Sequence, residues 1–531
     1  MSNEMTLPVL VSARAKSQPD FVVLTFECNG AEETRTYSQL WENALRIALA
    51  LRERGVKSGD RFAILMQNHP EFVESMVAAG ILGAVTVPID PRTKGEKLAY
   101  MLRDSGSTGV VCGDYALADV QEASASATSV AWAYVVGDDC PTANEKLYVG
   151  KFSQIYALPV IDMPIVSQSL GDLMQIMYTS GTTGDPKGIY IPHGRFDAVA
   201  KAGELVFGYR SSDRPYTGLS LTHGNAQFIT LAPALRMGLP AFFSRRFTKS
   251  RLWDVIRKYQ CTTFSLLGGM ATAIYSEPVK PSDADNTVRF VVSAGMPKVI
   301  WNAFVDRYKV HIFEFYGAME GGMTINPPGE GPAGSCGRVA PGLIAKVVDD
   351  EEKQVPPNIP GELWFRPADG TDAVVRYHNN PKASATKTTG GWLRTGDVVT
   401  MDDDGWIYFE HRLGGEIRRN GDFINPAYLE KAIAEHPGVS DVSVFGVAAK
   451  NGAPGEMDVA IAVIPVSPTQ FDPASVFAWC REKVESNMVP SYLMVVEEFP
   501  KTASEKIQPR FLKQMFESGQ CPIYRFQSTT A

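Results

Sequence analysis

Cysteine and histidine are scarce in this sequence. The 531 residues include only 7 of each, and no two cysteines have the spacing of a C-x-x-C pair. An odd number of widely separated cysteines argues against a disulfide framework, and the lack of a His/Cys cluster argues against a zinc site. The cysteine pattern therefore favours a reducing compartment.

Long apolar runs and an excess of positive charge are also missing. No stretch approaches the roughly 18 apolar residues of a membrane-spanning helix, and the N-terminus lacks the basic start and apolar core of a secretory signal. With 51 basic and 59 acidic side chains, the net charge of -8 argues against general binding to nucleic acid or anionic membranes. We therefore expect a cytoplasmic protein without either partner.

Helix and strand patterns alternate over much of the chain. Hydrophobic residues make up 44% of the sequence, which is enough for a large core. Between residues 36 and 112, apolar stripes at helical spacing alternate with short apolar runs, and the same rhythm returns over 231–263. Such alternation is typical of doubly wound α/β sheets. Residues 113–170 are less regular, and Ala123 to Ser129 predict a surface loop or a weak helix.

The pattern changes twice in the second half of the chain. Residues 334–412 contain more short β runs and predict a β-rich lobe. After residue 412, the order of strands and helices predicts a separate α+β domain. We therefore predict a large N-terminal domain (1–412), a hinge at 413–415 with two adjacent glycines, and a small mobile C-terminal domain (416–531).

The sharpest local feature is the segment from Tyr178 to Gly188, which follows a strand-like apolar run. Its four Ser and Thr hydroxyls, its glycines and Lys187 are the groups that surround phosphate oxygens in nucleotide sites. It is not a Walker A loop, because Lys187 is followed by Gly188 instead of Ser or Thr. The alternative interpretation is a plain surface turn.

Further motifs follow this segment in a fixed order. They are Ser293 to Pro297, Phe315 to Glu320, Thr395 to Asp397, His411 through Gly421 to Glu430, and Pro500 to Ile507. Together with the phosphate segment, they resemble the motifs of the acyl-adenylate-forming superfamily over roughly residues 10–515. Within that superfamily, the chain is most similar to stand-alone acyl-CoA synthetases, including those similar to carnitine/crotonobetaine-CoA ligase.

The resemblance implies an ATP site. The residues that match its nucleotide contacts are Thr179, Ser180, Gly181, Thr182, Thr183, Gly184, Lys187, Gly295, Met296, Phe315, Tyr316, Gly317, Met319, Asp397, Arg412 and Lys506. By this analogy, Tyr316 lies against adenine and Asp397 accepts the ribose hydroxyls. Glu320, with Thr179, is the expected ligand of Mg²⁺, since a hard cation prefers oxygen donors.

The same resemblance implies acyl, coenzyme A and catalytic residues. The acyl site is expected to include His223, Asn225, Gly295, Gly317 and Ala318. Coenzyme A is expected near Gly421 and Asp422. The expected catalytic residues are Lys506, Lys187, Glu320 and His223. Arg236, Arg245 and Arg246 are candidates for pairing with a second carboxylate on the substrate, although surface roles suit them better.

Each main candidate also has a purely structural interpretation. Glu320 could interact with a helix dipole, Tyr316 could belong to the core, and Asp397 could be a turn residue. Lys506 could be a solvated surface lysine, and His223 could be a hydrogen-bonded structural histidine. The common register of the motifs argues against the first four interpretations, and the structural interpretation of His223 stays open.

Three positions depart from the superfamily pattern. Met319 stands where a threonine usually precedes the glutamate, and methionine cannot donate a hydrogen bond to phosphate. Gly414 replaces the usual Asp or Lys of the hinge, which predicts a more permissive hinge. Glu505 replaces the glycine before Lys506 and could pair with that lysine.

The predicted function is an acid:CoA ligase that uses ATP, Mg²⁺ and coenzyme A. It activates a carboxylic acid as acyl-AMP and then transfers the acyl group to the CoA thiol. The alternatives are a ligase that loads a carrier protein, and an inactive nucleotide-binding homologue. Aromatic, aliphatic and polar acids all remain open as substrates. A homodimer is compatible with the resemblance.

Overall fold

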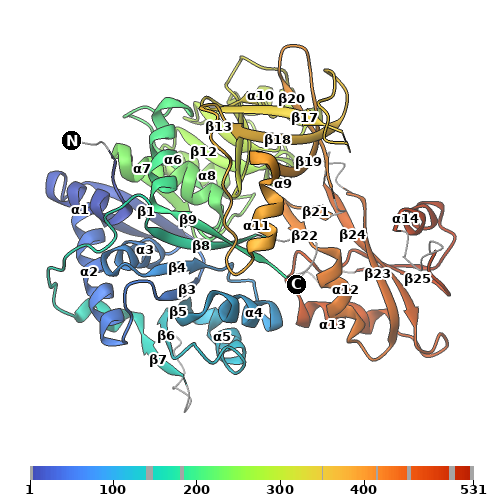
Figure 1. The fold of residues 1–531 in the computed structure, drawn as a ribbon, viewed down its shortest axis with the longest axis horizontal. Helices are drawn as coiled ribbons and strands as arrows, with labels where there is room; N and C mark the ends of the chain where they lie inside the picture. Colours follow the sequence, from blue (N-terminus) through green and yellow to red (C-terminus); the bar gives the residue numbers. More distant parts are fainter. Residues whose placement is uncertain are drawn as a thin grey trace.

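Two largely parallel β-sheets with helices on their faces form the greater part of the molecule, and a smaller domain lies beside them (Figure 1). The computed structural model describes residues 4–138, 147–179, 185–349, 351–413, 417–450, 456–500 and 509–526. The predicted α/β class, with a large N-terminal domain and a small C-terminal domain, is confirmed. No helix in these ranges has the length and apolar character to span a bilayer.

The first sheet of the N-terminal domain has seven strands among the described residues. In spatial order they are β7 (Tyr148–Lys151), β6 (Trp132–Val136), β5 (Ser107–Gly113), β3 (Arg61–Leu65), β4 (Val85–Pro88), β8 (Leu173–Thr179) and β9 (Lys187–Pro192). All neighbours are parallel except β8 and β9. The predicted phosphate segment therefore joins the antiparallel pair at one edge of the sheet.

The second sheet carries nine strands. In spatial order they are β16 (Arg338–Val339), β15 (Gly321–Asn326), β14 (His311–Ala318), β13 (Phe290–Ala294), β12 (Thr263–Leu267), β10 (Pro215–Thr217), β11 (Ala241–Ser244), β1 (Val22–Cys28) and β2 (Ala31–Thr36). The central strands, β14 to β1, are parallel. Their carboxyl ends therefore meet at one edge, which is where ligands bind in α/β sheets.

Helices cover the faces of both sheets in Figure 1. The N-terminal helices are α1 (Leu7–Ser17), α2 (Tyr37–Glu53), α3 (Pro70–Leu82), α4 (Gly95–Ser105), α5 (Leu117–Ser124), α6 (His193–Leu205), α7 (Ala232–Met237), α8 (Leu252–Tyr259), α9 (Gly268–Tyr275), α10 (Lys298–Tyr308) and α11 (Pro381–Lys387). Local chemistry fixes several ends. Thr36 and Gln39 form a reciprocal cap at the start of α2, and Gly83, with φ of 70°, ends α3.

The β-rich lobe and the small domain follow. The lobe is an antiparallel sheet of β17 (Leu343–Val348), β18 (Gly361–Pro367), β19 (Leu393–Met401) and β20 (Ile407–Arg412). The small domain contains the hairpin β21 (Ile417–Arg419) and β22 (Asp422–Ile424), the sheet β23 (Val439–Ala448), β24 (Met457–Pro465), β25 (Tyr492–Val495) and β26 (Ile523–Arg525), and the helices α12 (Pro426–Ala434), α13 (Pro473–Lys483) and α14 (Pro509–Ser518). It has its own apolar clusters on the two faces of that sheet.

The region 113–170 is more regular than its sequence predicts. It contains α5, β6, β7 and two short 3₁₀ helices, η1 (Asp114–Ala116) and η2 (Phe152–Ala157). The strands extend the first sheet, and β6 is buried throughout. Its aromatic residues pack against the ring of Phe62 and against each other, and these contacts are not visible as a local sequence pattern.

His193, at the start of α6, ties α1 to the body of the N-terminal domain. Its Nδ1 accepts a hydrogen bond from the Leu7 backbone N–H at 3.2 Å, and the side chain is buried. Burial lowers the pKa of His193 to about 4. The folded protein therefore binds this proton less readily than the unfolded chain does between pH 6.5 and 4.

We predict that His193 makes the protein less stable as pH falls. The unfolded state gains a proton below its pKa of about 6.5 while the folded state does not, so stability drops by up to about 1.4 kcal/mol per pH unit. In His193→Gln this loss is absent, so the stability advantage of the wild type shrinks from pH 7 to pH 5. Urea unfolding across this range measures it, with the exposed His311→Gln as control. Parallel pH profiles for the wild type and His193→Gln would contradict the prediction.

Candidate active site at the domain junction

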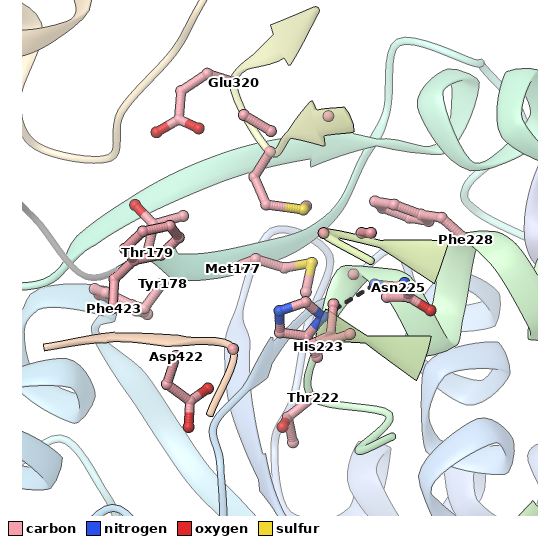
Figure 2. A pocket seen from close by; sticks show the side chains of 18 of the residues that line it. Met177, Tyr178, Thr179, Thr222, His223, Asn225, Phe228, Glu320, Asp422 and Phe423 are labelled. Carbon is pink, nitrogen blue, oxygen red and sulfur yellow. Dashed lines mark hydrogen bonds between the residues drawn. The ribbon is translucent and has the colours of Figure 1, made fainter. Parts of the chain in front are cut away.

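A cavity of about 480 Å³ lies where the two domains meet. The carboxyl ends of β4, β8, β12, β13 and β14 form its floor, and the small domain closes it through the β21–β22 hairpin and residues after α13. Among the predicted site residues, those that line the cavity are Thr179, His223, Asn225, Gly295, Phe315, Tyr316, Gly317, Ala318, Met319, Glu320, Asp397, Gly421 and Asp422. The motifs that are separate in the sequence therefore converge on one cavity (Figure 2).

Tyr316 and Asp397 form the wall on which a nucleotide is expected. The Tyr316 hydroxyl donates a hydrogen bond to Asp397 across the two sheets. The Tyr316 ring is stacked near Phe365, with 6.3 Å between ring centroids. Gly295 has a φ of 90°, and a Cβ there would lie 2.5 Å from the Arg418 guanidinium. Glycine at position 295 therefore lets the Arg418 guanidinium of the small domain lie against this backbone.

Glu314 belongs to the same wall and was not predicted. It is buried and accepts hydrogen bonds from the backbone N–H groups of Gly295 and Met296. Burial raises the pKa of Glu314 to about 8, although these hydrogen bonds and Arg418 oppose the shift. Its position two residues before Tyr316, on the same face of β14, is the sequence signal that could have identified it.

Tyr377 links two of the predicted catalytic residues and was also missed. Its hydroxyl donates to Glu320 Oε1 at 2.8 Å, and Lys187 Nζ lies 5.8 Å from the centre of its ring. Two of the predicted ATP contacts, Lys187 and Met296, are not among the residues that line the cavity. Nothing in the local sequence around Tyr377 predicts this bridge, because it depends on the loop after β18 lying against β9.

His223 and Asn225 stand on the opposite side of the cavity, before the π-helical turn η3 (Ala226–Leu231). The ring of His223 faces the cavity, and its Nδ1 accepts a hydrogen bond from the Asn225 backbone N–H at 3.2 Å (Figure 2). Desolvation of the imidazole by the surrounding protein lowers the pKa of His223, although the charges of Asp422 and Asp90 oppose this shift. A neutral imidazole matches the observed hydrogen bond, because Nδ1 acts as the acceptor.

Three polar contacts hold the small domain against the cavity. Lys97 Nζ lies 2.7 Å from Glu485 Oε1. Arg92 Nη2 lies 3.4 Å from Asp422 Oδ2, and Lys94 Nζ donates to the Arg481 carbonyl at 2.9 Å. These contacts place Gly421, with φ of 85°, next to Leu267 at the end of β12.

Several predicted residues lie outside the described ranges. They are Ser180, Gly181, Thr182, Thr183 and Gly184 of the phosphate segment, Gly414 and Gly415 of the hinge, and Glu505 and Lys506. The backbone of Arg412 pairs with that of Asp397, but its side chain is not described. The roles of these residues stay predictions.

The three candidate arginines for a second substrate carboxylate do not line the cavity. Arg236 pairs with Asp197 at 2.8 Å and Arg245 pairs with Glu33 at 2.7 Å. Arg246 is exposed. These contacts support surface or structural roles for the three arginines and not pairing with a substrate carboxylate.

Glu320 suits a cation that is also held by phosphate. In the described part of the chain, no three His, Cys, Asp or Glu side chains are grouped as a metal site. Mg²⁺ characteristically needs only one or two carboxylates when substrate phosphates complete its shell. Glu320 lines the cavity and provides such a carboxylate.

Comparison with known proteins establishes the family. Residues 11–371 match the AMP-binding enzyme family, and residues 428–506 match the AMP-binding enzyme C-terminal domain. The chain therefore belongs to the AMP-binding enzyme family. The resemblance to the acyl-adenylate-forming superfamily is confirmed.

Individual relatives cover nearly the whole chain. Crotonobetaine/carnitine–CoA ligase of Salmonella typhi is 28% identical over 504 residues, which are 93% of this chain and 96% of the relative. Long-chain fatty acid transport protein 1 of Mus musculus is 28% identical over 96% of this chain and 82% of its own. Among solved structures, the amide bond synthetase McbA from Marinactinospora thermotolerans has a TM-score of 0.82 at 22% identity, covering 96% of this chain and 100% of its own. The anthranilate CoA ligase AuaEII in complex with anthranoyl-AMP has a TM-score of 0.72 at 24% identity, covering 98% and 99%.

We predict that Lys97→Met loosens the docked small domain. The change leaves Glu485 as a largely buried charge without its cation, a loss of about 2 kcal/mol. Hydrogen–deuterium exchange should then increase in β21, β22 and α13. Lys353→Met, which removes an exposed ion pair with Glu351, is the matched control. Unchanged exchange in these elements would show that Lys97 does not hold the domain in place.

Proposed function

We propose that this protein is an AMP-forming acid:CoA ligase. In the first step, a substrate carboxylate attacks the α-phosphate of ATP, giving acyl-AMP and pyrophosphate. In the second step, the thiolate of coenzyme A attacks the acyl carbon, and AMP leaves. The observation that carries the proposal is the convergence of Tyr316, Asp397, Glu320, His223 and Gly421 on one cavity.

The first step brings one anion to a polyanion, so it requires cations and oriented donors. We assign the β- and γ-phosphates to the segment from Thr179 to Lys187. Asp397 accepts the ribose hydroxyls, because an ionised carboxylate accepts two O–H donors. Its hydrogen bond from Tyr316 holds both side chains ready on the nucleotide wall.

Glu320 and Thr179 would hold the magnesium ion that accompanies ATP. Bound there, Mg²⁺ supplies charge neutralisation for the phosphates. Tyr377 fixes the Glu320 carboxylate through its 2.8 Å hydrogen bond. Met319 supplies no hydroxyl next to this glutamate, so donors to the α-phosphate come from elsewhere, and we assign Lys506 to that task.

The second step uses the face that the small domain presents in this structure. Gly421 and Asp422 lie at the cavity wall, and we assign the approach of the CoA thiol to this side of the cavity. A Cβ at position 421 would lie 3.0 Å from the Leu267 side chain, so glycine avoids a close contact at this part of the cavity wall. His223 lies between the acyl side of the cavity and Asp422. Its lowered pKa favours the neutral ring, which suits a residue beside the reacting carboxylate of the substrate.

The two steps require two positions of the small domain. In Figure 1, α14 lies on the side of the small domain that faces away from the N-terminal domain. Lys506 precedes α14 by three positions in the chain. We therefore assign the present arrangement to thioester formation, and a rotation about residues 413–415 to adenylation.

The names of the relatives support a carboxylic acid substrate and a CoA acceptor. The Salmonella relatives are crotonobetaine/carnitine–CoA ligases, and several structural neighbours are CoA ligases or synthetases for aromatic or fatty acids. These names span several acid classes and therefore do not identify the substrate. Cytoplasmic location and a homodimer stay predictions from the sequence.

We predict acid-dependent pyrophosphate release from ATP and Mg²⁺, with continuous turnover only when CoA is present. A panel of benzoates, aromatic diacids, fatty acids and carnitine-like acids tests this. Acyl-CoA and AMP should form in equal amounts. A single equivalent of pyrophosphate that CoA does not change would favour a ligase with another acceptor, such as a carrier protein. If no acid of the panel causes pyrophosphate release, the ligase assignment is contradicted.

We predict that Lys506→Ala abolishes acyl-AMP formation and spares thioester formation from supplied acyl-AMP. The cation of Lys506 is needed where the substrate carboxylate meets the α-phosphate of ATP. The second step brings no two anions together in this way, so it does not need that cation. Quenched-flow measurement of each half-reaction provides the comparison, with Lys513→Ala on α14 as control. An equal loss in both half-reactions would show that the two-position assignment is wrong.

A further inference from the structure

The acyl side of the cavity contains a buried amide that the proposed chemistry does not use. The Asn225 side chain is only 8% exposed and lines the cavity. Neither its Nδ2 nor its Oδ1 has a hydrogen-bond partner among the described residues. A buried amide without partners is unfavourable, because the hydrogen bonds it makes with water in the unfolded chain are lost and not replaced. Such a group at a cavity wall is a built recognition point for a ligand.

A second polar group, Arg195, lines the same cavity from the first turn of α6. Its guanidinium donates to the backbone carbonyl of Ala318 at 3.0 Å and to that of Met319. It forms no ion pair with any carboxylate in the described part of the chain. Arginine stays charged in proteins and has five N–H donors, so these two carbonyls leave several donors without an acceptor. Glu320 is the carboxylate that interacts electrostatically with this guanidinium, without forming an ion pair.

Apolar side chains line the same cavity, among them Val199, Phe228 and Met323. Glu320 also lines it and interacts electrostatically with Arg195. Met319 lies between the polar groups, because its carbonyl contacts Arg195 and its sulfur lies 2.6 Å from where a Cβ of Gly224 would be. Figure 2 shows Asn225 and Phe228 on the opposite side of His223 from Thr179, which begins the phosphate segment.

We propose that the substrate is a carboxylic acid with an apolar body and a second group that accepts hydrogen bonds, a carbonyl or a second carboxylate, at the end remote from the reacting carboxylate. This inference rests on the proposed function and names its substrate class. Arg195 and Asn225 both offer N–H donors, so they match an acceptor. A quaternary ammonium at the same place would bring like charge to Arg195.

The expected selectivity follows from the cost of leaving these groups unsatisfied. A hydrocarbon acid that fills the cavity leaves the Asn225 amide without a partner and removes water from the Arg195 guanidinium without replacing its hydrogen bonds. Sites built to hydrogen-bond a substrate group reject analogues that lack it far more strongly than apolar pockets reject a missing methylene. The preference therefore appears in kcat/KM and disappears when the donor is removed.

The test uses sets of acids of equal length. Each set contains a plain acid, its terminal keto and carboxylate counterparts, and its terminal trimethylammonium counterpart, in aliphatic and aromatic series. Pyrophosphate release with ATP, Mg²⁺ and CoA gives kcat/KM for each. We expect the wild type to favour the acceptor-bearing acid over the plain acid by at least about tenfold. In Asn225→Leu this ratio should fall by at least about tenfold.

Two further variants make the result specific. Phe228→Leu alters the same compartment without changing its polarity, so it should change kcat/KM for paired acids by one common factor. Arg195→Met also removes the carbonyl contacts, so its readout is the ratio between paired acids and not total activity. A wild type that prefers the plain or the trimethylammonium acid, or an unchanged ratio in Asn225→Leu, would overturn the inference while leaving the ligase intact. If no acid causes pyrophosphate release, both the substrate inference and the ligase assignment are overturned.

Discussion

The site exists because the small domain docks on the carboxyl ends of the parallel strands. Lys97 with Glu485 and Arg92 with Asp422 connect the domains through opposite charges at the rim of the cavity. Without that docking, the floor formed by β12, β13 and β14 would be an open edge. Enclosure strengthens every charge interaction inside the cavity, because it excludes water. The same polar contacts can open without breaking the apolar core of either domain, which suits the two positions that we propose for the small domain.

Charge placement within the cavity follows from this enclosure. The nucleotide wall carries the carboxylate of Asp397, and the expected cation site carries that of Glu320. Burial raises the pKa of Glu314 on the same wall to about 8, which favours its neutral form. The acyl side is apolar apart from Asn225, His223 and Arg195. Hydrogen bonds from Tyr316 and Tyr377 fix two of the carboxylates, so the wall is organised before any ligand binds. An anionic substrate and a polyphosphate can then meet without a large rearrangement of the N-terminal domain.

Much of this arrangement could be predicted from the sequence. Strands and helices with clear periodicity, such as β3 and α3, lie within the alternating pattern of residues 36–112. Residues in motifs, such as Tyr316 and Asp397, meet in the cavity as predicted. Tyr377 and Glu314 were missed, because the bridge of Tyr377 depends on tertiary contacts and a buried glutamate resembles any other in sequence. The region 113–170 was underestimated because its strands are stabilised by aromatic contacts between neighbours. Arg195 was not singled out, since one arginine on a helix carries no local signal of burial.

The central claim is that the substrate carboxylate attacks the α-phosphate of ATP. Isotope transfer tests it directly: a substrate acid labelled with ¹⁸O in both carboxylate oxygens is turned over with ATP, Mg²⁺ and CoA, and the products are analysed by mass spectrometry. Attack at the α-phosphate predicts one ¹⁸O atom in the AMP released and none in pyrophosphate. Label in inorganic phosphate, with ADP as the other product, would contradict the account, because the acid would then have attacked the γ-phosphate.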